Sequence, residues 1–116
     1  MRRVRQSDID DLYTAIHALK SLDECRRFFR DLLTETEIRE FAERWKAARM
    51  LWQGMPYTFI ERQTGLSSRT IARVHRWLKR GKGGYLMVLR RQQGSNKPAG
   101  QAGQEGAGSQ LYPGKV

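Results

Sequence analysis

The side chains best suited to chemistry in this sequence are five cations that recur at helical spacing between positions 69 and 80. Arg69, Arg73, Arg76 and Arg80 follow one another at intervals of three or four residues, which places them on one face of a helix, and Lys79 lies beside them. An arginine can donate two parallel hydrogen bonds to the O6 and N7 atoms of guanine, and any cation can neutralise a phosphate. The spacing therefore indicates a surface that contacts nucleic acid.

Other kinds of chemistry lack the residues they need. The chain has one cysteine, Cys25, and two histidines, His17 and His75, too few for a four-ligand zinc site or a disulfide framework. The sequence holds no Ser/His/Asp arrangement, phosphate-binding glycine loop or metal-ligand spacing. We therefore expect no cofactor, no metal and no enzymatic activity.

Charge is distributed unevenly along the 116 residues, whose net charge is +10. Residues 1–43 carry 8 basic and 10 acidic side chains, whereas residues 44–91 carry 12 basic side chains and one acidic. A strongly basic segment favours a polyanionic partner, most often double-stranded DNA and less often an anionic membrane surface. No apolar run reaches the roughly 18 residues of a membrane span and no signal-like segment is present, so we expect a cytoplasmic protein without a membrane segment.

The elements that must position the cations are predicted to form a helix-turn-helix over about residues 57–80. A short helix over 57–64 and a second helix ending near residue 80 flank a tight turn at 65–67. The packing requires apolar residues that face each other across the bend, an apolar residue that fills the turn and a glycine that permits it. These are Ile60, Ile71, Val74, Leu66 and Gly65.

In a helix-turn-helix the second helix enters the major groove with its N-terminal part against the bases. Arg69 is placed to read a guanine, and the small Ala72 allows close approach and contact with a thymine methyl group. Tyr57 and Thr58 begin the first helix and can donate hydroxyl or backbone N–H groups to a phosphate. The residues predicted to contact DNA are Tyr57, Thr58, Ser67, Ser68, Arg69, Ala72, Arg73, Arg76, Lys79 and Arg80. The alternative is an ordinary helical hairpin with a solvated cationic face.

Three more helices are predicted before the helix-turn-helix, and no segment alternates as a strand does, so the fold class is all-α. We expect the first helix to run from a cap at Ser7 to about residue 20 and the second to restart at Ser21. Thr34 opens a capping box for the third helix, which covers about residues 35–53.

The end of the chain is predicted to carry little structure. The segment Gly81-Lys82-Gly83-Gly84 stops the last long helix, and residues 85–89 can form one short apolar turn. Residues 92–116 are rich in Gly and Gln and poor in apolar side chains, which predicts a disordered tail. The remaining residues, 1–91, are predicted to form one helical domain.

The third predicted helix suggests a core shared between two chains. Its apolar residues fall on two sides, with Trp45 and Trp52 on one and Met50 and Leu51 on the other, so it should be buried on both. Short amphipathic helices in one chain of this length cannot readily cover so much aromatic surface. A helical bundle in the form of an intertwined homodimer would cover it.

Several segments resemble the Trp repressor family and its shorter branch of Trp-repressor-like proteins. The resemblance covers about residues 8–90 and implies an all-helical, intertwined homodimer that acts as a bacterial transcriptional repressor. The segments that carry it are residues 33–44, residues 64–74, Phe41-Ala42-Glu43-Arg44-Trp45, Gly54-Met55-Pro56-Tyr57 and Gly81-Lys82-Gly83-Gly84-Tyr85.

The resemblance also implies a possible effector pocket at Thr34, Arg44, Arg73, Val74 and Trp77. In Trp repressor two arginines sandwich the indole of the co-repressor and a threonine helps to bind it, and Arg44, Arg73 and Thr34 stand at the matching positions. Val74 replaces a glycine against which the indole packs, and Trp77 replaces a serine that helps to hold the ligand. These larger side chains are expected to fill the pocket, so that the protein does not respond to tryptophan and Arg73 serves DNA instead.

Together these patterns predict a sequence-specific transcriptional regulator, expected to be a repressor, that binds a palindromic operator as a homodimer. One alternative is a DNA-targeting module related to a recombinase or transposase. Others are an architectural DNA-binding protein without sequence preference and an interaction protein that uses its aromatic surface.

Overall fold

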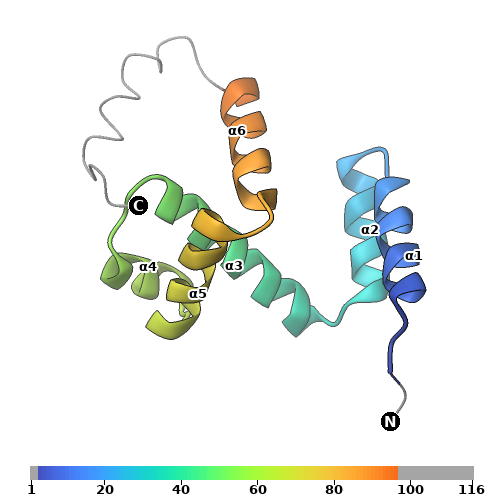
Figure 1. The fold of residues 1–116 in the computed structure, drawn as a ribbon, viewed down its shortest axis with the longest axis horizontal. Helices are drawn as coiled ribbons and strands as arrows, with labels where there is room; N and C mark the ends of the chain where they lie inside the picture. The colour runs from blue at the N-terminus through green and yellow to red at the C-terminus, as the bar shows by residue number, and fades with distance from the viewer. Residues whose placement is uncertain (1–2, 97–116) are drawn as a thin grey trace. The chain divides into compact units, whose positions relative to one another are not determined.

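The protein is entirely helical over the residues that the structure describes, 3–96 (Figure 1). The structure is a computed structural model. Its helices are α1 (Gln6–His17), α2 (Leu22–Leu32), α3 (Glu35–Trp52), α4 (Tyr57–Thr64), α5 (Ser68–Arg80) and α6 (Gly84–Asn96). The prediction of an all-α fold is confirmed, and none of these six helices is long and apolar enough to span a membrane.

Residues 3–39 belong to one compact unit, in which α1 and α2 run in opposite directions as a helical hairpin (Figure 1). Neither α1 nor α2 has a buried residue. Large apolar side chains such as Tyr13 and Leu22 are exposed on them. The hairpin therefore has no buried core of its own within the chain.

The capping signals of this unit form largely as predicted. The Ser21 hydroxyl accepts the Glu24 N–H at 3.1 Å and begins α2. Thr34 and Glu37 form a reciprocal capping box, with the Glu37 N–H on the Thr34 hydroxyl at 3.1 Å and the Thr34 N–H on the Glu37 carboxylate at 2.9 Å. Each pair satisfies amides that the first turn of a helix leaves free.

The predicted bounds of the first helix were wrong at both ends. Helix α1 begins at Gln6 after Arg5, not after Ser7, because the Asp8 carboxylate accepts the Arg5 N–H at 3.3 Å. It ends at His17 instead of near residue 20. The N–H of Lys20 donates to the Glu24 carboxylate at 2.8 Å, so it belongs to the start of α2.

Residues 40–96 belong to a second compact unit, which contains the buried core. The core lies among the C-terminal half of α3 and helices α4, α5 and α6. Its buried apolar residues are Ala47, Ala48, Met50, Leu51, Ile60, Ile71, Val74, Leu78 and Leu89. Ala47 and Ala48 are adjacent in α3, and both are fully buried. Adjacent residues of a helix point in different directions, so their burial agrees with the expectation that this helix packs on two sides.

Helix α3 ends at a glycine, as the sequence predicts. Gly54 has a φ of 84°, a left-handed conformation that favours glycine. The Gly54 N–H donates to the Leu51 carbonyl at 2.9 Å, and the Met55 N–H donates to the Met50 carbonyl at 3.0 Å. This Schellman pattern satisfies the last carbonyls of α3 and turns the chain toward α4.

Helix α6 is longer than the short turn predicted over 85–89. It runs from Gly84 to Asn96 and so includes residues 92–96, which were expected to belong to the tail. Leu89 is buried, and Tyr85 and Leu86 pack against the core, so one side of the helix is fixed by tertiary contacts. The rest of the predicted tail, residues 97–116, lies outside the described residues.

Candidate nucleic-acid interface

Helices α4 and α5 pack against each other through the residues that the sequence assigned to the bend. Ile60 of α4 and Ile71 and Val74 of α5 are buried in the core, and Leu66 of the turn is half-buried against it. Gly65 has a φ of 77°, so its backbone adopts the left-handed conformation that the turn requires. The predicted packing of the helix-turn-helix is confirmed.

Thr64 stabilises this turn, a role that the sequence patterns did not predict. Its side chain is only 5% exposed, its hydroxyl donates to the Ile60 carbonyl at 2.8 Å, and the same oxygen accepts the Leu66 N–H at 3.1 Å. One hydroxyl thus links the last turn of α4 to the start of the connection to α5. A threonine directly before a turn glycine was the available sequence signal.

A lysine from α3 holds the end of α4. The Lys46 Nζ atom donates to the Gln63 carbonyl at 3.3 Å, near the C-terminus of α4. A cation is stabilising at this end of a helix because the last carbonyls are free and carry partial negative charge. The helix-turn-helix is therefore tied to α3 by a polar contact as well as by the core.

Ser67 begins α5 as its N-cap residue. Its hydroxyl accepts the Thr70 N–H at 3.2 Å and also lies 3.2 Å from the Thr70 hydroxyl, to which it donates. The Ser67 side chain is thus already used within the chain, although it was assigned to DNA. Ser68 and Arg69, which follow it, are exposed.

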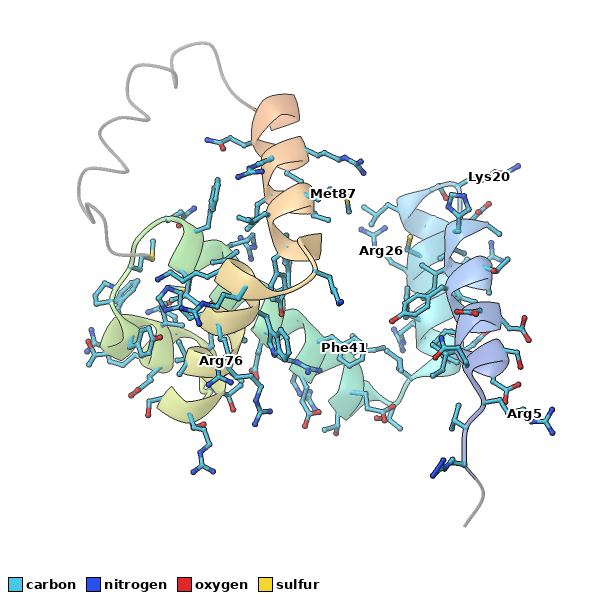
Figure 2. All side chains as sticks on the ribbon, viewed as in Figure 1. Arg5, Lys20, Arg26, Phe41, Arg76 and Met87 are labelled. Carbon is cyan, nitrogen blue, oxygen red and sulfur yellow. The ribbon has the colours of Figure 1, made fainter. Side chains whose placement is uncertain are left out.

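The cations of α5 lie on its exposed side. Arg69, Arg73, Arg76, Lys79 and Arg80 are all exposed, and Ala72 lies half-buried among them; Figure 2 shows Arg76 extending from the helix. Over residues 3–96, no carboxylate lies within ion-pair distance of these five side chains, and the ion pair of Asp23 and Arg27, at 3.9 Å, belongs to α2. Their charge is therefore available to an anionic partner.

The N-terminus of α4 lies beside the middle of α5 through an aromatic pair. The Tyr57 hydroxyl and the His75 Nδ1 atom are 2.8 Å apart, and the two rings meet edge to face with centroids separated by 5.7 Å. Burial, and secondarily the charge of Lys79, lower the pKa of His75 below its usual 6.5. The imidazole is therefore neutral at neutral pH.

The residues of the possible effector pocket occupy different environments. Val74 is 2% exposed and belongs to the core, whereas Trp77 is 52% exposed. Arg73 is exposed on α5, and Thr34 caps α3. The Arg44 guanidinium lies 5.0 Å from the centre of the Phe41 ring.

One hollow of the second unit includes a predicted pocket residue. It is lined by Phe41, Arg44, Trp45 and Tyr85, with the Trp45 and Tyr85 rings stacked at a centroid distance of 6.1 Å. Arg44 lines it, but Arg73, Val74 and Trp77 do not. Among residues 3–96, no group of three or more His, Cys, Asp or Glu side chains is placed to hold a metal ion.

Comparison with known proteins gives one family. Residues 7–93 match the family model described as Trp repressor protein. The chain is 46% identical over 89 residues to the uncharacterized protein YerC of Bacillus subtilis (strain 168), covering 77% of this chain and 86% of that protein.

Solved structures give the same result. A TrpR-like protein from Eubacterium eligens ATCC 27750 has a TM-score of 0.70 and 40% identity, with 73% of this chain and 88% of that chain covered. A Staphylococcus aureus protein has a TM-score of 0.69 and 41% identity, with 75% and 87% covered.

The turn geometry predicts that the Thr64 hydroxyl stabilises the interface more than its methyl group does. Thr64→Val keeps the shape but leaves the partly buried Leu66 N–H without its acceptor, so the free energy of unfolding should fall by about 1–3 kcal/mol. Thr64→Ser retains the hydroxyl and should cost clearly less. Urea denaturation followed by circular dichroism measures both, and equal losses would contradict the assigned hydrogen bonds.

Proposed function

The chain belongs to the Trp repressor family, and from this premise we propose that it is a sequence-specific repressor that binds a palindromic operator as a homodimer. The coarser part of this statement, a DNA-binding transcription regulator, follows from the family. The proposal places the protein in the cytoplasm, with the DNA that it binds.

The observation that carries the proposal is the set of unpaired cations on α5. A core of Ile60, Ile71 and Val74 holds the buried side of the helix against α4, so the opposite side is presented in a fixed orientation. Arginines with no carboxylate in reach repel one another, and a partner with regularly spaced phosphates relieves that repulsion. Duplex DNA has this property.

The positions along α5 suggest a division of roles. Arg69 lies in the first turn, the part of a recognition helix that reaches base edges, where it can read a guanine. Ala72 is small enough to let the groove floor approach. Arg73, Arg76, Lys79 and Arg80 follow along the helix and are suited to the phosphate backbone, which fixes register without reading sequence.

The homodimer is supported by the apolar surface that the chain leaves exposed. Helices α1 and α2 hold no buried residue, yet α1 carries Ile9, Leu12 and Tyr13 with 37%, 37% and 64% of their surface exposed. A second copy that packs on this surface would bury it. Two-fold symmetry would place the two α5 helices about 34 Å apart, one turn of DNA, and so match a palindromic operator.

We also propose that tryptophan is not the effector. Val74, at the position where the resemblance expects a glycine, is sealed in the core, and Trp77 is a bulky side chain where it expects a serine. Both changes leave less room for a free indole than the family pattern does.

Two substitutions on α5 test the DNA-binding role. Arg69→Ala should relax preference at one base position, by about 1–3 kcal/mol, because a bidentate contact to that base is lost. Lys79→Ala should weaken binding to all sequences about equally and reduce the salt slope by about 1.

Selection of bound sequences from a random DNA pool measures the base preference of each variant. Titration of the enriched site at several salt concentrations measures its affinity and salt slope. Equal effects of the two variants would contradict the assigned roles. A flat sequence preference with a steep salt slope would indicate an architectural protein instead.

The dimer can be tested by mass and by a substitution in α1. Light scattering after size exclusion should give twice the chain mass of 13.5 kDa. Leu12→Glu introduces a charge into the apolar stripe and should shift the protein toward monomer, whereas Thr14→Glu on the polar side should not. A wild-type protein that elutes as a monomer would overturn the homodimer.

Isothermal titration with L-tryptophan tests the effector. We expect no saturable heat at micromolar to millimolar ligand, with or without the enriched DNA site. Saturable micromolar binding would show that Val74 and Trp77 leave the pocket open.

A further inference from the structure

The Tyr57–His75 pair joins the two helices of the proposed DNA-binding element by a direct side-chain hydrogen bond. Tyr57 is the first residue of α4, and His75 lies in the middle of α5. The 2.8 Å distance between the Tyr57 hydroxyl and His75 Nδ1 allows either group to be the donor. The choice of donor decides whether the hydrogen of the Tyr57 hydroxyl is used in this bond or remains available for a second one.

The neutral imidazole of His75 has two tautomers, with its single N–H hydrogen on either Nδ1 or Nε2. Burial and the nearby Lys79 lower the pKa of His75, so the ring is neutral at neutral pH and carries its hydrogen on one nitrogen only. If Nε2 carried it, Nδ1 would accept from the Tyr57 hydroxyl. If Nδ1 carried it, Nδ1 would donate to that hydroxyl.

The surroundings of Nε2 favour the second arrangement. The Nε2 atom is buried and has no hydrogen-bond partner within the described part of the chain. A buried N–H without an acceptor loses its hydrogen bond to water and gains nothing, and such donors are rarer in native proteins than unpaired acceptors. Placing the hydrogen on Nδ1 avoids an orphaned donor and keeps the bond to Tyr57.

This arrangement leaves the hydrogen of the Tyr57 hydroxyl unused. No second partner for that hydroxyl lies within residues 3–96, so it can donate outward. Tyr57 is also the first residue of α4, where the backbone amides of Tyr57 and Thr58 have no helical acceptor and the helix carries partial positive charge.

We propose that His75 is a positioning residue whose Nδ1–H makes the Tyr57 hydroxyl a dedicated donor to a phosphate oxygen of DNA. This inference rests on the proposed function and adds a contact outside α5. Because Tyr57 sits on α4, its phosphate contact anchors the duplex at a second helix. That anchor restricts the tilt of α5 in the groove without reading a base.

The tautomer can be tested without DNA. Long-range ¹H–¹⁵N spectra of the full ¹⁵N-labelled chain at pH 7.5 should show His75 with a protonated Nδ1 and an unprotonated Nε2. The chain has only two histidines, so loss of one set of signals in His75→Asn assigns the spectrum. A proton on Nε2 would overturn the proposal.

The contact is tested by the affinity for the selected DNA site. Tyr57→Phe should bind about tenfold more weakly, to all sequences alike, because a hydrogen bond to a charged oxygen is lost. His75→Leu should cause a similar loss of affinity. The double variant should bind no more weakly than either single variant, because each substitution alone already removes the phosphate contact made by the Tyr57–His75 pair. His75→Asn retains an N–H donor and should restore much of the affinity.

Tyr85→Phe is the matched control, since it removes a phenolic hydroxyl from α6, outside the proposed interface. The melting temperatures of all variants separate loss of contact from loss of fold. If the wild type binds DNA and Tyr57→Phe binds equally well, the proposal is overturned while the proposed function stands. If the wild type binds no DNA, both are overturned.

Discussion

The packing of α4 against α5 is the constraint on which the rest of this structure depends. Ile60, Ile71 and Val74 exclude water from the seam between the two helices, and Gly65 supplies the backbone conformation that brings them together. The Thr64 hydroxyl then closes the turn by serving a carbonyl on one side and an amide on the other. A seam fixed in this way leaves the opposite side of α5 no freedom to rotate, so its cations form a defined surface.

That surface is electrostatically unfavourable for the isolated chain. Five cations within one helix raise the free energy of the folded state through mutual repulsion, and within residues 3–96 no carboxylate forms an ion pair with any of them. A fold selected for stability alone would place acidic partners among them. Their absence is physically reasonable when an external polyanion such as duplex DNA supplies the counter-charge.

The two units of the chain differ in what holds them together. The unit from Glu40 onward has a core with contributions from four helices, whereas α1 and α2 contribute no buried residue. A helical hairpin without a buried core gains little to offset the entropy of ordering it. The apolar stripes of α1 and α2 therefore contribute to stability only when another surface covers them. This is the physical basis of the proposed homodimer.

The sequence by itself determined the caps at Ser21 and Thr34, the bounds of α4 and α5, and the cationic row of α5, because each depends on contacts between residues a few positions apart. Only the tertiary structure decided the longer α6, through the packing of Tyr85, Leu86 and Leu89 on the core, and the bond between Tyr57 and His75. These features depend on which helix faces which. Spacing along the chain carries no information about that.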